Sequence, residues 1–157
     1  MKKLFTILLM MPLLWACSSS DDDNKGGISD ELLGTWNSTR AYIDVEINDK
    51  DIEDKVKREW SNEDGDIVLE FKNNGKVYFT DLEDDFKESA SYYVSGNKLV
   101  LSADGHKATC SFNIKNNTLT TQEDVKEDVL EDLKYEGVDV SNIKIKKAVL
   151  YNEYRRL

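Results

Sequence analysis

Several residue types on which whole classes of protein depend are scarce in this sequence. Its 157 residues include only 2 Cys, 1 Pro and 8 Gly, which excludes a disulfide-stapled miniprotein and a collagen-like or low-complexity polymer. The length leaves room for one globular domain and a leader. Positive charge is also scarce, since 21 Lys and Arg stand against 31 Asp and Glu, for a net charge of −10. Phosphate backbones repel such a chain, so we expect no nucleic-acid partner.

The residues that usually carry catalysis are few. The single histidine, His106, follows an Asp104-Gly105 turn, where an exposed imidazole is the usual outcome. The sequence has no Gly-x-Ser-x-Gly, Cys-x-x-Cys, His-Glu-x-x-His or phosphate-binding glycine loop, and no segment has the ligand spacing of a calcium-binding EF-hand. Cys110 has inward parity in a predicted strand and no adjacent basic activator, so we expect a buried structural thiol. We therefore expect no enzyme, no cofactor and no metal site.

The N-terminus reads as an export signal. Lys2 and Lys3 precede an apolar run from Leu4 to Ala16, which is too short to span a bilayer as a folded helix. The run ends in Leu14-Trp15-Ala16-Cys17, which resembles a bacterial lipobox, although Trp15 replaces the usual small or hydroxyl residue. The resemblance implies that residues 1–16 are removed and that Cys17 carries acyl chains as a membrane anchor. The alternative is ordinary secretion with Cys17 as a free thiol.

Residues 17–30 are predicted to form a flexible acidic tether, because a polar, charged stretch cannot bury enough apolar area to become ordered. The run Ser18-Ser19-Ser20-Asp21-Asp22-Asp23 resembles the tether of surface-displayed lipoproteins of the Bacteroides group. That resemblance implies an outer-membrane protein that faces the cell exterior. A solvated linker without an export role is the alternative, and both readings are compatible.

Residues 31–157 are predicted to form one domain of short strands. Turns are predicted at Gly96-Asn97, Asp104-Gly105 and Asn116-Asn117. Antiparallel pairing about these turns predicts six cross-strand pairs: Val94 with Leu99, Tyr92 with Leu101, Leu101 with Ala108, Leu99 with Cys110, Ile114 with Leu119, and Phe112 with Thr121. Four successive strands thus agree on one apolar face. At Asn73-Asn74-Gly75, only a three-residue bulged loop with Gly75 in the left-handed region sets Phe71 against Val77, so we predict that turn.

Two helices interrupt the strands. Thr121 can cap a helix in which Val125, Val129 and Leu133 recur every four residues and Gly137 ends the helix. The second helix is predicted between Asn48, as its cap, and Trp60, because Ile52, Val56 and Trp60 recur every four residues; the alternative is a hairpin loop that contains the intervening acidic residues. Strands near 36–47, in the pair at 66–80, four times between 91 and 121, and at 143–154 make eight. A mostly β, eight-stranded, up-and-down antiparallel barrel with one or two short helices follows, because closure removes exposed edges.

Leu33-Gly34-Thr35-Trp36 resembles the Gly-x-Trp that opens the first strand of lipocalins, and the helix before the last strand is similarly placed. The resemblance implies that Trp36 lies at the barrel base, beside Gly34, covered by Arg155 or Arg156. A guanidinium over an indole face contributes about 0.5–2 kcal/mol. The helix after the first strand is a departure, more similar to fatty-acid-binding proteins.

The inward positions of the predicted barrel are candidate ligand contacts. They are Ile67, Leu69, Phe71, Val77, Phe79, Tyr92, Val94, Leu99, Leu101, Phe112 and Ile114, together with Cys110. These side chains either line a pocket for a small apolar or amphipathic ligand or fill the barrel as its core. In the second case we expect a protein-interaction or inhibitor module. Within the acidic loop from Asp81 to Phe86, we expect solvated carboxylates and Phe86 packed on the barrel, the alternative being a lid or a partner anchor.

Overall fold

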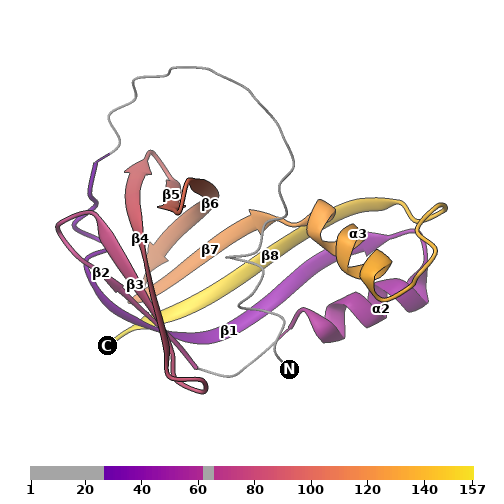
Figure 1. Ribbon diagram of the computed structural model, residues 1–157, viewed down its shortest axis with the longest axis horizontal. Coiled ribbons are helices and arrows are strands. Elements are labelled where there is room, and N and C mark those ends of the chain that lie inside the picture. The colour runs from indigo at the N-terminus through magenta and orange to yellow at the C-terminus, as the bar shows by residue number, and fades with distance from the viewer. Residues whose placement is uncertain (1–26, 62–65) are drawn as a thin grey trace.

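The computed structural model describes residues 27–61 and 66–157. The predicted signal peptide, Cys17 and the first part of the tether lie outside these residues. The elements are β1 (Gly34–Ile47), α2 (Lys50–Glu59), β2 (Ile67–Phe71), β3 (Lys76–Asp81), β4 (Phe86–Ser95), β5 (Lys98–Ala103), β6 (His106–Lys115), β7 (Thr118–Asp124), α3 (Lys126–Tyr135) and β8 (Ile145–Arg156). The strands pair in sequence order and β8 returns to β1, which confirms the closed, up-and-down, eight-stranded barrel (Figure 1).

Turn chemistry sets the register of the hairpins as predicted. The structure contains all six predicted cross-strand pairs, between β4 and β5, β5 and β6, and β6 and β7. The β2–β3 hairpin has the bulged turn, with Phe71 opposite Val77 and Gly75 at a φ of +73°. Glycine adopts the left-handed backbone conformation at little energetic cost, because it has no side chain to clash with the backbone.

The barrel has two different ends. The base carries the turns at 72–75, 96–97 and 116–117, and the chain segment before β1 crosses it: Gly27 bridges to Val94, and Leu32 is fully buried. The last residues assigned to the tether therefore lie against the barrel. The other end, the mouth, carries the loop 81–86, the turn 104–105 and the connection from β7 to α3. The alternating strand directions place all of these connections at the mouth.

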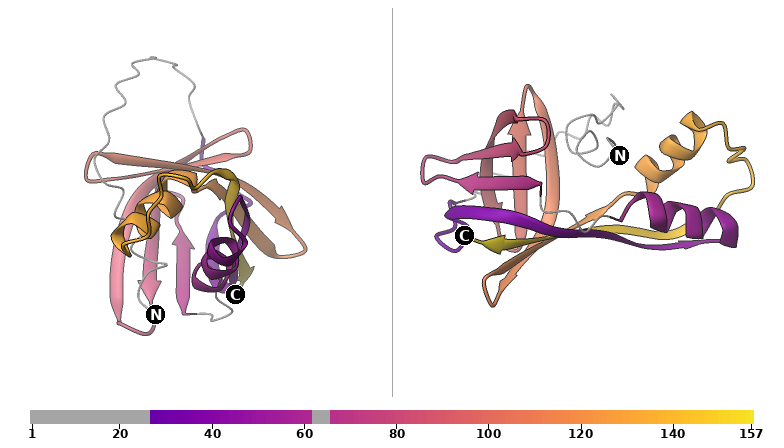
Figure 2. Two further views of the ribbon diagram at one scale, coloured as in Figure 1. Left: turned by 90° about the vertical axis from the view of Figure 1, so that its right-hand side faces the viewer. Right: turned by 90° about the horizontal axis from the view of Figure 1, so that it is seen from below.

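β1 and β8 continue past the mouth as a two-stranded ribbon, and both helices lie on one side of it (Figures 1 and 2). We call this part the arm; it comprises residues 43–60 and 125–150. Its core is separate from the barrel core and consists of Ile43, Val45, Ile47, Val56, Trp60, Val125, Val129, Leu133, Ala148 and Leu150. The arm exists because the inward face of β1 and β8 stays apolar beyond the barrel and needs a cover. Neither helix in the described chain is long and apolar enough to cross a membrane.

The predicted helix caps were both wrong. Thr121 is not a cap, because it lies within β7 between Phe112 and Asn152, and α3 begins only at Lys126. Paired strands on both sides satisfy the backbone of this segment better than a helix start would. Gly137, at a φ of +82°, does follow the end of α3 as predicted.

Asn48 does not cap α2. Asp49 is the cap, and its carboxylate accepts from the backbone N–H groups of Asp51 and Ile52. Asn48 instead holds the far end of the arm together: its side-chain oxygen accepts from the N–H of Lys144 at 2.7 Å. Its amide nitrogen donates to the carbonyl oxygen of Asn142 at 3.0 Å.

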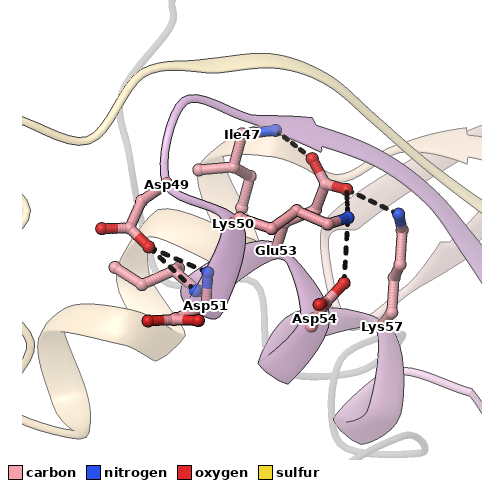
Figure 3. Close-up of polar contacts among 8 residues, drawn as sticks. Ile47, Asp49, Lys50, Asp51, Glu53, Asp54 and Lys57 are labelled. Carbon is pink, nitrogen blue, oxygen red and sulfur yellow. Dashed lines mark hydrogen bonds and ion pairs between the residues drawn. The ribbon is translucent and has the colours of Figure 1, made fainter.

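A buried carboxylate fastens α2 to the end of β1 (Figure 3). Glu53 accepts from the backbone N–H of Ile47 at 3.1 Å and from the ammonium groups of Lys50 and Lys57 at 2.8 and 2.7 Å. Hydrogen bonds from these groups lower the pKa of Glu53 to about 2. Because every bond favours the ionised form, this charge is satisfied within the arm and is a structural element.

Candidate functional site

All eleven candidate contact residues face the barrel interior. Seven are buried in the barrel core: Leu69, Phe71, Val77, Phe79, Tyr92, Leu99 and Leu101. The other four, Ile67, Val94, Phe112 and Ile114, pack against that core and are only partly buried. Whether they contact a ligand remains a prediction.

β6 differs from every other strand of the barrel. Each of the other seven strands contributes at least two buried residues, whereas β6 contributes none. Its inward residues Ala108, Cys110, Phe112 and Ile114 are all half-buried. Their partners on β5 and β7 are Leu101, Leu99, Thr121 and Leu119, so the interior is packed next to β5 and looser next to β6.

The adjoining strands β7 and β8 present a polar wall to the interior, which consists of Thr121, Glu123, Asn152 and Tyr154. Thr121 lies opposite Asn152, and Tyr154 lies opposite the fully buried Leu119. In residues 27–61 and 66–157 no hydrogen bond or ion pair reaches any of the four side chains. Yet among these residues no enclosed side-chain oxygen or nitrogen lacks a partner. The polar atoms of the wall are therefore accessible to solvent from inside the barrel or its mouth.

Burial and like charge shape the electrostatics of this wall. Glu123 is half-buried, and desolvation, followed by the neighbouring carboxylate of Asp128 on α3, raises its pKa to about 7. Burial raises the pKa of Cys110 to about 12, with Glu123 adding to the effect. The pKa of Tyr154 is also raised, first by burial and then by Cys110 and Glu123. These side chains therefore share one weakly hydrated space in which negative charge is disfavoured.

Replacing Glu123 with glutamine is expected to stabilise the protein above neutral pH. The folded-state pKa of about 7 lies above the ordinary value of 4.5, so the stability of the wild type falls as pH rises from about 4.5 to 7. At about pH 8, Glu123→Gln should therefore be more stable by about 1–2 kcal/mol, the full shift being reduced because the side chain keeps solvent contact. At about pH 4.5 the two proteins should unfold alike.

Urea unfolding at both pH values checks this result. Glu127→Gln is the matched control, since Glu127 is an exposed residue in the first turn of α3. A gain at pH 8 no larger than that of the control would contradict the assigned environment of Glu123.

The barrel base has the arrangement that the Gly-x-Trp resemblance implies, with Arg156 as the covering residue. Its guanidinium lies 4.3 Å from the centre of the Trp36 ring. It also donates to the carbonyl oxygens of Leu33 and Glu31. Arg155 is exposed. Gly34 has a φ of +116°, which a residue with a side chain rarely adopts.

The acidic loop at the mouth corrects one expectation. Phe86 does not pack on the barrel; it is 46% exposed, and Leu82 is 58% exposed. Asp81 holds the loop by accepting from the N–H groups of Glu83 and Asp84. The loop therefore presents two apolar side chains to solvent beside its carboxylates.

Sequence reasoning missed the polar wall. Glu123 has the same parity as Leu119 and Thr121, so alternation along β7 was a usable signal. The capping pattern at Thr121 hides this signal, because a helix that starts there would end the strand before Glu123. His106 is exposed at its turn, and no three His, Cys, Asp or Glu in the described chain gather as metal ligands.

Comparisons with known proteins include a family match and a similar solved structure. A search of curated proteins found no match. A solved structure of a lipocalin-like protein from Bacteroides uniformis is similar, with a TM-score of 0.44 and 11% sequence identity, over 81% of this chain and 99% of that one. A family model described as a lipocalin-like domain matches residues 32–137. Because this match spans more than half of the chain, the protein belongs to the lipocalin-like domain family.

Proposed function

We propose that this protein binds a small apolar or amphipathic molecule inside its barrel, between the apolar core and β6. The observation that carries the proposal is the half-buried inward face of β6. A core packed to ordinary density leaves such side chains no accessible surface, whereas a binding space leaves them partly exposed. The base is closed by Leu32, Trp36 and Arg156, so a ligand would enter through the mouth.

The proposed role is binding and not catalysis. His106 is exposed at its turn at the mouth. The raised pKa of Cys110 keeps its thiol protonated at neutral pH, so that it is a poor nucleophile.

Filling the interior tests the binding function. Ala108→Trp places an indole next to the half-buried face of β6 and is expected to weaken binding of the neutral fluorescent probe N-phenyl-1-naphthylamine by at least about 10-fold. The matched control is Thr109→Trp, on the exposed outer face of the same strand, which should bind as the wild type does. Circular dichroism verifies that both variants are folded. Equal probe affinity in the two variants, or no binding by the wild type, would refute an interior site.

We further propose that the mature protein is anchored by lipid at Cys17 in the outer membrane and faces the cell exterior. The support is the lipobox resemblance and the acidic tether. In cells fed an alkyne-labelled palmitate, the wild type should be labelled and sediment with membranes. Cys17→Ala should lose the label completely, and the control Cys110→Ala should keep it. Label retained by Cys17→Ala would rule out this attachment site.

The exposed Leu82 and Phe86 favour a second candidate function, in which the mouth binds a protein partner and the interior is only a core. In that case native mass spectrometry of the protein from envelope extract finds no retained small molecule. Leu82→Ser with Phe86→Ser then abolishes cross-linking to the partner in cells, while Ala108→Trp leaves it unchanged.

A further inference from the structure

The polar wall and the apolar core lie on opposite sides of the barrel interior. In the closed strand order, β7 lies four strands from β3, and β8 lies four strands from β4. The inward side chains of β3 and β4 include Val77, Phe79, Ala90 and Tyr92 of the barrel core, the partly buried Val94 and, toward the mouth, Glu88, which lies opposite Phe79. A molecule in this space therefore has one side against hydrocarbon and the other against unpartnered polar groups.

The polar groups need a partner that the described chain does not supply. Tyr154 lies deep enough for burial to be the main cause of its raised pKa, and no described residue bonds to its hydroxyl. The Glu123 carboxylate lies closer to the mouth and has no cation beside it. Lys126, the nearest lysine in the chain, pairs with Asp124 at 3.4 Å. Leaving such groups unpaired is costly, so water or a ligand must satisfy them.

The charge at the mouth selects the sign of that ligand. Among the described residues, the segments 81–86, 104–105 and 123–128 lie at the mouth, and Asp66 at the end of the connection from α2 to β2 lies beside the first of them. The acidic residues of 81–86, 104–105 and 123–128 are Asp81, Glu83, Asp84, Asp85, Asp104, Glu123, Asp124, Glu127 and Asp128; Lys126 is the single basic residue within these segments, and Lys87, His106 and Lys107 directly follow the first two. A predominantly negative rim attracts cationic ligands and repels anionic ones. An anionic amphiphile would also have to bring its charge beside Glu123 and Asp128, and the carboxylate of Asp128 already disfavours the ionised form of Glu123.

We infer that the preferred ligand is a cationic amphiphile, whose ammonium group pairs with Glu123 and Asp128 at the mouth while its apolar part contacts the barrel core. This inference rests on the proposed binding function and specifies its ligand class. The groups that face Glu123 from neighbouring elements are Cys110 on β6, Tyr154 on β8 and Asp128 on α3. None of them is cationic, so among residues 27–61 and 66–157 no positive charge faces Glu123, and the ligand supplies one. The hydroxyl of Tyr154 and the amide of Asn152 remain available to any neutral polar group of the same molecule.

Three probes with one chain length separate charge from hydrophobicity: decyltrimethylammonium, 1-decanol and decyl sulfate, each below its micellar concentration. At about pH 8, decyltrimethylammonium should bind the purified protein at least about 10-fold more tightly than decyl sulfate by isothermal titration calorimetry, with 1-decanol between them. Its affinity should fall several-fold at about pH 5.5, where Glu123 is protonated, and that of 1-decanol should not change. The quaternary ammonium keeps its charge at both values, so the pH effect reports on the protein.

Substitutions assign the effect to the two carboxylates. Glu123→Gln with Asp128→Asn should reduce the preference for decyltrimethylammonium over decyl sulfate to less than about 3-fold and leave 1-decanol binding intact. The control Asp124→Asn with Glu127→Gln removes the same charge from exposed positions and should keep most of the preference. If the two double variants lost the preference for decyltrimethylammonium equally, the rim charge would act only at long range, and this would overturn the assignment to Glu123 and Asp128.

The outcomes separate this inference from the proposed function. If 1-decanol binds and Ala108→Trp abolishes its binding, but decyl sulfate binds as well as decyltrimethylammonium does, the barrel is a binding site and the ligand class is wrong. If none of the three probes binds, the proposed function fails and the inference fails with it.

Discussion

Replacing Trp36 with alanine is expected to lower the free energy of unfolding by about 3–5 kcal/mol, among the largest effects of any single substitution in this protein. The side chain is fully buried at the barrel base, and its indole N–H donates to the carbonyl oxygen of Leu32 at 2.8 Å. Arg156 covers its other face. Alanine would leave a cavity there, free the carbonyl of Leu32 and remove the surface on which the guanidinium lies.

Urea unfolding followed by circular dichroism measures this loss. Trp36→Phe should fall between the two proteins, because phenylalanine retains much of the apolar contact and cannot donate to Leu32. Tyr135→Ala is the exposed control, at 89% exposure, and should change stability by less than about 0.5 kcal/mol. A loss of less than about 1 kcal/mol for Trp36→Ala would mean that the packing of segment 27–33 on the barrel does not depend on the Trp36 side chain.

Leu133→Ala should destabilise the arm by about 2–4 kcal/mol and leave most of the barrel unaffected. Leu133 is buried in the arm core, where α3 packs on β8. Because this core is separate from the barrel core, α3 can open without exposing the barrel interior. Local opening of this size corresponds to amide exchange about 30- to 1000-fold faster.

Hydrogen exchange resolved by residue distinguishes a local from a global loss. The amides of α3 should exchange faster in Leu133→Ala, while those of β2 to β5 should keep their wild-type rates. Leu82→Ala, which removes an exposed leucine at the mouth, should change neither set. Exchange that accelerates equally in α3 and in β3 would show that the arm and the barrel unfold as one unit.

Much of the barrel was predictable because its information is local. A tight turn links β4 to β5, β5 to β6 and β6 to β7, and a two-residue turn together with strict alternation leaves one register that keeps the apolar face continuous. At Gly75, only the bulged turn aligned Phe71 with Val77, and the structure has that turn. Which of Arg155 and Arg156 covers Trp36 could not be predicted from the local sequence, since it depends on which of the two side chains points toward Trp36 in the folded protein.

The helix caps failed for a related reason. Thr121 and Asp124 have a capping pattern, but β8 lies beside them and pairs with this segment as far as Asp124. Pairing with a strand some thirty residues later is invisible to a window of four residues. The same applies to Asn48, whose side chain bonds across the arm to residues 142 and 144.

Turn residues and alternating apolar positions thus determine the strands and the register of the hairpins, since each depends on neighbours within about ten residues. The closure of the barrel joins β1 to β8 and depends on residues far apart in the chain. The arm with its own core, the looser packing along β6 and the polar wall follow only from the assembled molecule. They arise where β7, β8, β1 and the two helices meet, and the environment of a side chain such as Glu123 depends on all of them at once. Hydrophobic burial and desolvation act between residues that are close in space, whatever their separation along the chain.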